Sequence, residues 1–174
     1  GLLQKVRFTP EDILVLDGDM LEKGRDSLAL LRYMMELSRT HTVYPICGNC
    51  DGLVFRFFET DELDGRFYAS SLPQHPESTI RQLADEMGFE DWMDFPGLRA
   101  ALRERYPEIH AWLAGLPTIL ETEHLVFVHG GVPSLEHMET LDRWKCMKND
   151  DFRGQGYSFS KYVIVGHWPV TLYN

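Results

Sequence analysis

The chain has 174 residues, of which 44% are hydrophobic and 25% are charged. These values are typical of one globular domain and exclude a wholly disordered protein. The net charge of −10 argues against non-specific binding to nucleic acid or to an anionic membrane, because both favour a basic surface. It does not argue against a phosphorylated substrate, because a bound metal ion can reverse the local field.

Three further features bear on where the protein works. No apolar run approaches the roughly 20 residues of a membrane-spanning helix, and the N-terminus lacks the pattern of a signal peptide. An odd count of three cysteines suits a reducing compartment. We therefore expect a cytoplasmic protein with no membrane partner. Because the sequence begins at Gly1 and stops at Asn174 without a closing element, we expect residues 1–174 to form one domain that is incomplete at both ends.

The first third of the chain predicts a strand–helix–strand unit with parallel strands. Residues 12–18 form an apolar run that ends at glycine, which is typical of a buried strand. Asp26 or Ser27 can cap a helix. The apolar residues that follow fall at helical spacing: Leu28, Leu31, Met34, Met35 and Leu37. A second strand is predicted at residues 42–47, where Pro45 favours an edge position.

The middle of the chain, residues 53–116, predicts a mostly helical insertion that we expect to shape substrate specificity. Gly88 marks the end of the first helix in it. Gly65, Pro73 and Pro76 predict a loop over residues 60–77. Apolar spacing indicates helices at residues 78–87, 98–106 and 108–113.

The last third of the chain predicts a return to strands. Apolar runs at residues 125–128 and 162–165 have the length of buried strands. Residues 149–160 between them are polar, contain glycine and predict a surface loop. The order of the elements therefore predicts an α/β protein.

Each of the four predicted strands is followed by a polar side chain beside a glycine. These side chains are Asp19, Asn49, His129 and His167. In an α/β sheet, ligands gather just outside the carboxyl ends of the strands, so we expect the four residues to converge. A carboxylate, an amide oxygen and two imidazoles suit Mn, Fe or Zn better than Ca or Mg. The sequence therefore predicts a metal site with these four ligands.

The same positions carry motifs that resemble those of the calcineurin-like metallophosphoesterases. The motifs, in chain order, are Gly-Asp-Met-Leu-Glu-Lys-Gly at 18–24, Gly-Asn-Cys-Asp at 48–51, His-Gly-Gly at 129–131 and Gly-His-Trp-Pro at 166–169. The sequence looks most like the bacterial branch that is related to serine/threonine protein phosphatases and diadenosine tetraphosphatases. Pro169 favours this branch, because other branches carry a further histidine there. The resemblance spans residues 12–52 and 109–170.

This resemblance implies a sandwich of two β-sheets flanked by helices, with two divalent metal ions. Asp19 would bridge the two ions, and Asn49, His129 and His167 would complete the shell of the second. Two such ions hold a phosphate, activate hydroxide and stabilise an in-line displacement. The implied activity is hydrolysis of a phosphomonoester, in a phosphoprotein or a small molecule, or of a nucleotide phosphoanhydride. Because a metal-bound histidine usually donates its other ring N–H, both histidines should show an acceptor for that proton.

The sequence departs from the family pattern in three respects. No Asp-x-His motif precedes Asp19, so we expect the ligands of the first metal to lie upstream of this sequence. Cys50 replaces the histidine that would protonate the leaving group, and Asp51 keeps the place of that histidine's carboxylate partner, so both are assigned to catalysis. Lys23 replaces a phosphate-binding arginine, and a lysine offers a point charge instead of a bidentate fork. Lys148 lies near the place of another phosphate-binding arginine.

Two other classes of protein remain open. Cys47 and Cys50 have the spacing of a thioredoxin-like redox motif, but Asp51-Gly52 predicts a turn where that motif requires a helix. A zinc knuckle would need more cysteines than Cys146 alone can add. A degenerate, non-catalytic binding module with the metallophosphoesterase fold is favoured by the missing first-metal ligands and by Cys50. The presence of all four second-metal ligands argues against it.

Overall fold

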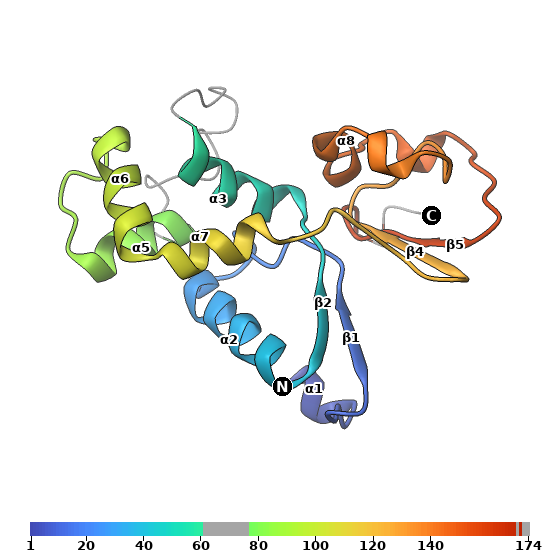
Figure 1. The fold of residues 1–174 in the computed structure, drawn as a ribbon, viewed down its shortest axis with the longest axis horizontal. Coiled ribbons are helices and arrows are strands. Elements are labelled where there is room, and N and C mark those ends of the chain that lie inside the picture. Colours follow the sequence, from blue (N-terminus) through green and yellow to red (C-terminus); the bar gives the residue numbers. More distant parts are fainter. Residues whose placement is uncertain (61–76, 170, 172–174) are drawn as a thin grey trace.

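The computed structural model describes residues 1–60, 77–169 and 171, which form two small β-sheets and a group of helices (Figure 1). The short helix α1 (Leu2–Lys5) precedes the first sheet. This sheet consists of β1 (Ile13–Leu16) and β2 (Thr42–Pro45), which run parallel with Ile13 opposite Thr42. Helix α2 (Ser27–Thr40) connects them, and the Asp26 carboxylate accepts the Ala29 N–H at its start. The predicted strand–helix–strand unit is confirmed.

A helical group follows the first sheet. It comprises α3 (Asn49–Glu59), α5 (Thr79–Met87), α6 (Phe95–Arg105) and α7 (Pro107–Ala114). Ser78 and Asp94 cap α5 and α6, and Gly88 ends α5 in the left-handed conformation. These ends confirm the predicted helices to within a few residues. The loop predicted at residues 60–77 falls almost wholly on residues 61–76, which lie outside the described residues.

Two elements of this region differ from the sequence expectation. The turn predicted at Asp51-Gly52 is wrong, because both residues lie in α3, which begins at Asn49. Gly52 packs closely in this helix and does not form a turn: a Cβ on it would lie 3.1 Å from the Met147 sulfur. The other difference is β3 (Ile119–Glu121), a three-residue strand that the apolar pattern did not indicate.

The second sheet has the strand order β3–β4–β5. Strand β4 (Leu125–Val128) pairs antiparallel with β3 and parallel with β5 (Tyr162–Ile164). Both β4 and β5 were predicted. The connection between them contains the 3-10 helices η1 (Met138–Thr140) and η2 (Phe152–Gly154) and the short helix α8 (Arg143–Met147).

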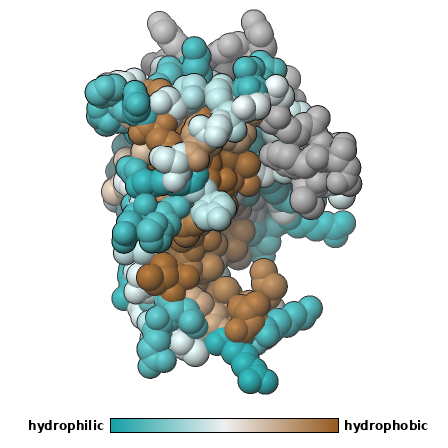
Figure 2. Space-filling view, turned by 90° about the vertical axis from the view of Figure 1, so that its right-hand side faces the viewer, coloured by the Kyte–Doolittle hydropathy of each residue, from teal (hydrophilic) through white to brown (hydrophobic). Residues whose placement is uncertain are grey.

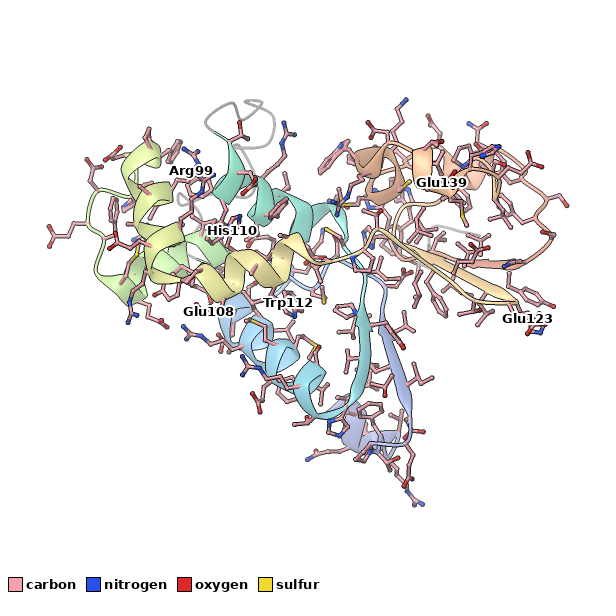
Figure 3. All side chains as sticks on the ribbon, viewed as in Figure 1. Arg99, Glu108, His110, Trp112, Glu123 and Glu139 are labelled. Carbon is pink, nitrogen blue, oxygen red and sulfur yellow. The ribbon has the colours of Figure 1, made fainter. Side chains whose placement is uncertain are left out.

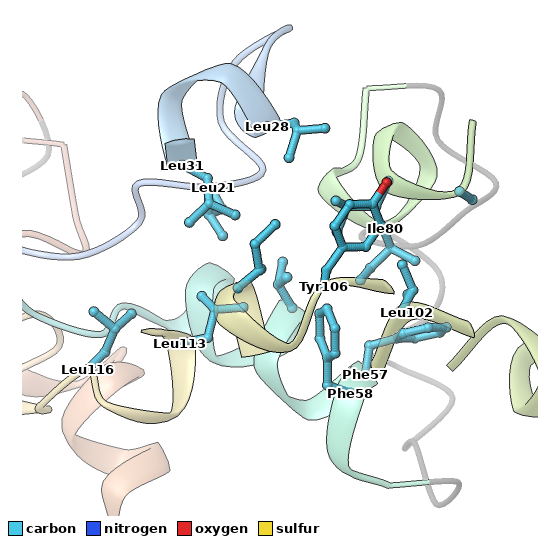
Figure 4. Packing of buried hydrophobic residues seen from close by; sticks show 14 of the residues in the cluster. Leu21, Leu28, Leu31, Phe57, Phe58, Ile80, Leu102, Tyr106, Leu113 and Leu116 are labelled. Carbon is cyan, nitrogen blue, oxygen red and sulfur yellow. The ribbon is translucent and has the colours of Figure 1, made fainter. Parts of the chain in front are cut away.

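Two apolar clusters stabilise the described residues. The larger lies between the helices and includes Phe57, Phe58, Leu102 and Tyr106 (Figure 4). The smaller lies on the second sheet, around Val126, Val128, Val132 and Cys146. The molecule therefore has a helical part and a sheet part with separate cores, which confirms the α/β class.

The two sheets meet where β1, β2, β4 and β5 end and β3 begins, and they extend away from that meeting point (Figure 1). The Asp17 carbonyl after β1 accepts the Nδ1–H of His129 after β4, at 2.6 Å. The Cys47 N–H after β2 donates to the Pro117 carbonyl before β3, at 2.7 Å. The strand ends, where the predicted ligands lie, are thus also the junction of the molecule.

The outer faces of the sheets keep apolar side chains in contact with solvent. Ile13 on β1 is 66% exposed and Ile164 on β5 is 39% exposed. The face of the molecule in Figure 2 shows hydrophobic residues between polar ones. Among the described residues, no helix is long and apolar enough to cross a membrane.

Candidate metal centre

The Gly18-Asp19 turn after β1 brings a carboxylate into the junction. Both residues have left-handed backbones, with φ of 81° at Gly18 and 52° at Asp19, so the chain reverses sharply at the strand end. Asp19 Oδ1 accepts the Cys50 N–H at 2.9 Å and lies 3.3 Å from His129 Nε2. The turn therefore joins the loops that follow β1, β2 and β4.

Close backbone packing holds the loops after β1 and β2 together. A Cβ on Gly48 would lie 2.6 Å from Asp19 Oδ1 and still closer to the Asp19 amide nitrogen. A Cβ on Gly18 would lie 2.6 Å from His129 Nδ1. Glycine is required at both positions because any larger residue would push these loops apart.

The structure brings three of the four predicted ligands into one cluster. Asp19, His129 and His167 each offer a ligand atom, and these atoms all lie within 4.8 Å of one another. Asn49 opens helix α3 beside this cluster, where its neighbour Cys50 bonds Asp19. Three buried atoms of these residues form no hydrogen bond with the described residues: Asn49 Oδ1, His167 Nδ1 and His129 Nε2, the last of which lies 3.3 Å from Asp19 Oδ1. Buried polar atoms without partners are costly, so this donor set fits a cation.

The second ring nitrogen of each histidine has the acceptor that the sequence predicted. His129 Nδ1 lies 2.6 Å from the Asp17 carbonyl, which can only accept, so Nδ1 carries the proton and Nε2 offers its lone pair. His167 Nε2 lies 2.9 Å from Asp150 Oδ1, which leaves Nδ1 free to bind a metal. Such outer partners fix the tautomer and the orientation of a ligating imidazole.

The other described histidines lie away from the cluster, as expected. His110 is among the helices, stacked on Phe58 and 2.6 Å from Glu59 (Figure 3). His41 stacks on Phe8, and His124 and His137 lie beside exposed glutamates. His75 falls outside the described residues.

The charges at the centre shift the pKa values of its groups in opposite directions. Burial alone would raise the pKa of Asp19, but the His129 imidazole and the Cys50 N–H outweigh burial and hold the pKa well below its usual range. Burial would lower the pKa of His129, but the Asp19 carboxylate outweighs it and raises this pKa. In the metal-free protein the two groups therefore favour an ion pair, which a metal would have to displace.

The two lysines assigned to phosphate binding both lie at the margin of the centre. Lys23 Nζ is 3.4 Å from Asp19 Oδ2, with 61% of its side chain exposed. Lys148 Nζ donates to Asp150 Oδ1 at 3.0 Å, the same oxygen that His167 contacts. These hydrogen bonds lower the pKa of Asp150, so it is a carboxylate. A cavity of about 480 Å³ borders this group and is lined by Lys145, Lys148 and Asp150 among others.

Comparison with known proteins now adds to the geometry. A family model described as calcineurin-like phosphoesterase matches residues 2–173. The chain belongs to the calcineurin-like phosphoesterase family. Comparison with curated proteins gave no significant match. The family generally uses divalent metals and hydrolyses phosphoesters, in agreement with the cluster of unpaired donor atoms at the strand ends.

In this calcineurin-like phosphoesterase, Asp51 links two loops through their backbones. It is fully buried, Oδ1 accepts the Leu21 N–H at 3.0 Å, and Oδ2 accepts the Gly48 N–H at 2.9 Å. Burial raises the pKa of Asp51 to about 6, although both hydrogen bonds oppose the shift. Its contacts are those of a positioning residue, and a role in proton transfer stays a prediction.

Cys50 lies in the centre with 6% of its surface exposed. Burial and the Asp19 charge raise the pKa of its thiol to about 12. Burial likewise raises the pKa of Cys47 to about 12. A redox-active motif lowers the pKa of its nucleophilic thiol, so the environment of these cysteines disfavours disulfide exchange.

The sequence analysis missed one group at the centre, the Asp17 carboxylate at the end of β1. Both its oxygens are buried and have no hydrogen-bond partner. Burial raises the pKa of Asp17 to about 6, against the opposing effect of His129. The only sequence signal for Asp17 was the Asp-Gly-Asp pattern at 17–19. Asp19 alone was assigned as a ligand there, because it is the aspartate of the Gly-Asp motif.

Proposed function

We propose that this protein hydrolyses phosphomonoesters or nucleotide phosphoanhydrides at the strand-end centre, as a phosphatase-like member of its family. The observation that carries the proposal is the set of convergent donor atoms that are buried and unpaired. Asp19, Asn49, His129 and His167 would hold a divalent ion, with Mn, Fe or Zn favoured by the mixed oxygen and nitrogen set. A second ion, bridged by Asp19, is part of the proposal.

When bound, the divalent ions would activate water for attack and stabilise the attacking and leaving oxygens. The chain's own residues would prepare the centre for this reaction. The Asp17 carbonyl and the Asp150 carboxylate hold the outer N–H groups of His129 and His167, so both rings keep the ligating orientation. The Lys23 ammonium, next to Asp19, would bind a phosphate oxygen.

We further propose a cytoplasmic setting and a phosphorylated small molecule, nucleotide or phosphoprotein as the partner. All three cysteines are free and buried, which supports a reducing compartment. The net charge of −10 supports a partner other than nucleic acid or an anionic membrane.

The test is turnover of nitrophenyl phosphate by the full chain with added Mn²⁺. Asp19→Asn should reduce turnover by more than the roughly 100-fold that loss of an outer partner of a ligand can cost. Its circular dichroism spectrum should match the wild type. The control is Asp91→Asn, which changes an exposed carboxylate in the same way and should keep full activity. Near-normal turnover by Asp19→Asn would refute the proposal.

A second candidate function, a metal-containing binding module without turnover, is favoured by one observation. Cys50, at the place of the expected acid, has a pKa of about 12 and is a poor proton donor. Measurements of binding and of hydrolysis distinguish the two functions. A module would bind Mn²⁺ and phosphate yet hydrolyse neither nitrophenyl phosphate, nor a phosphoserine peptide, nor a dinucleoside polyphosphate.

A further inference from the structure

We propose that Asp17 is an additional carboxylate ligand of the centre and binds a cation at a position separate from the one that His129 Nε2 faces. The inference rests on the proposed function, because it assumes that the centre holds divalent ions. It adds a residue that the four predicted ligands do not include.

The first argument is the state of the carboxylate. Both Asp17 oxygens are buried and neither accepts a hydrogen bond from any described residue. Asp51, by contrast, is also buried but accepts a backbone N–H with each oxygen. An ionised carboxylate without partners is costly to bury, and a protonated one would still leave its O–H without an acceptor. Neither protonation state of Asp17 is satisfied by the residues that the structure describes.

The second argument is the position of Asp17. A Cβ built on Gly166, next to His167, would lie 3.2 Å from Asp17 Oδ2 and 3.3 Å from His129 Nδ1. The carboxylate therefore lies between the end of β1 and the loop that carries His167, on the Nδ1 side of His129. Asp17 is also not one of the three residues whose ligand atoms lie within 4.8 Å of one another, Asp19, His129 and His167. A cation at Asp17 would accordingly occupy a different position from one at Nε2.

The third argument is charge. Asp17 and Asp19 put two carboxylates on either side of one glycine, and the cationic partners His129 and Lys23 lie 3.3 Å and 3.4 Å from the oxygens of Asp19. The Nδ1–H of His129 is already donated to the Asp17 carbonyl, so it gives the Asp17 carboxylate no hydrogen bond. Hard carboxylate oxygens are favourable ligands for Mn²⁺ and Mg²⁺. A divalent ion would satisfy both Asp17 oxygens.

The test is Mn²⁺ binding by the full chain, measured by calorimetry, together with thermal unfolding without metal and with saturating Mn²⁺. Asp17→Asn should bind one equivalent fewer, or bind more weakly by at least the roughly 10- to 100-fold that loss of an outer partner of a ligand costs. Its melting temperature without metal should equal or exceed that of the wild type, because the substitution removes an unpaired buried charge. The increase in melting temperature on adding Mn²⁺ should be smaller. Asp91→Asn, an exposed control, should change none of these values.

Unchanged Mn²⁺ stoichiometry and affinity in Asp17→Asn would overturn the inference and leave the proposed function intact, as expected if a buried water satisfies the carboxylate. Failure of Asp17→Asn to fold without metal would also overturn it, because the fold itself would then need the carboxylate. A wild-type chain that binds no Mn²⁺ would instead refute the proposed function, and this inference with it. Recovery of the lost equivalent in Asp17→Glu would support the inference.

Discussion

The helical part and the strand-end centre differ in the kind of side chains that they bury. Between the helices, the core consists mainly of leucine and aromatic side chains, with Phe57, Phe58 and Leu102 fully buried. At the strand ends, buried oxygens and nitrogens of Asp17, Asn49 and two histidines have no partner, and they make up most of such atoms in the described chain. The helical part therefore supplies stability without a ligand, whereas the centre gains stability only when a cation satisfies it. Substitutions in the two parts should separate stability from metal affinity.

The largest effect is expected from Gly48→Ala at the centre. The added methyl would overlap the Asp19 backbone and carboxylate, so the loops that carry Asp19 and Asn49 would move apart. Displacement of a catalytic group by about 1 Å can reduce turnover about 100-fold, so Mn²⁺ binding and turnover should both be lost to at least this degree. Gly24→Ala is the matched control, since a Cβ there meets nothing within 4 Å. Equal Mn²⁺ affinity in the two variants would contradict the packing argument.

In the helical part, Leu102→Ala should lower stability and leave the centre unchanged. Leu102 is fully buried in α6, and removal of such a side chain costs about 2–5 kcal/mol of unfolding free energy. Leu30→Ala on the 40% exposed surface of α2 is the control and should cost much less. Urea unfolding measures the stability, and calorimetry measures Mn²⁺ affinity at a temperature where both variants are folded. A matching loss of Mn²⁺ affinity would show that the two parts are coupled.

Asp51 lies at the boundary between the helical part and the strand-end centre. Asp51→Asn should therefore lower both the stability of the fold and the Mn²⁺ affinity. An amide can accept with one atom only, so either the Leu21 or the Gly48 N–H would lose its acceptor, at a cost of about 1–3 kcal/mol. Mn²⁺ affinity should fall as well, because these hydrogen bonds hold the ligand loops in register. Asp142→Asn, at the start of α8, accepts a single exposed N–H and is the control. A lower kcat with unchanged Mn²⁺ affinity and stability would instead support the proton-transfer role predicted for Asp51.

The helical part and the centre also differed in how far the sequence could predict them. Local signals were enough for most elements: Asp26 and Ser78 start helices, Gly88 ends one, and apolar runs mark β1 and β4. Helix α3 was misread at its start because Gly52 and Asp51 have local turn propensity, whereas their actual roles depend on contacts with Met147 and with the loop after β1. Propensity is a weak prior where tertiary contacts decide.

The convergence of three of the four predicted ligands, Asp19, His129 and His167, was predictable because parallel strands bring their carboxyl ends together. Asp17 was not, because its distinguishing property is the absence of a hydrogen-bond partner, which only the surroundings reveal. Strand β3 was missed for a related reason. Three residues are too few for a sequence pattern, and this strand is defined by its pairing with β4.

The smallest change in activity is expected at Cys50. It is measured by comparing turnover of two substrates, a phosphoserine peptide and nitrophenyl phosphate. A leaving alkoxide, as from phosphoserine, must be protonated as it departs, whereas nitrophenolate is a much better leaving group and needs less assistance. With a thiol pKa of about 12, Cys50 is a far weaker acid than a histidine with its ordinary pKa of about 6.5. The wild-type chain should therefore prefer aryl phosphates or phosphoanhydrides to phosphoserine and phosphothreonine.

Cys50→His should raise turnover of a phosphoserine peptide relative to nitrophenyl phosphate by about tenfold. This is less than the roughly 100-fold that a well-placed acid contributes, because the imidazole must fit where the thiol is 6% exposed. Cys50→Ser, which removes the thiol without adding an acid, is the control and should leave the ratio unchanged. If both substrates respond equally to Cys50→His, or the wild type already prefers the alkyl ester, residue 50 does not occupy the place of an acid. The proton would then have to come from another group.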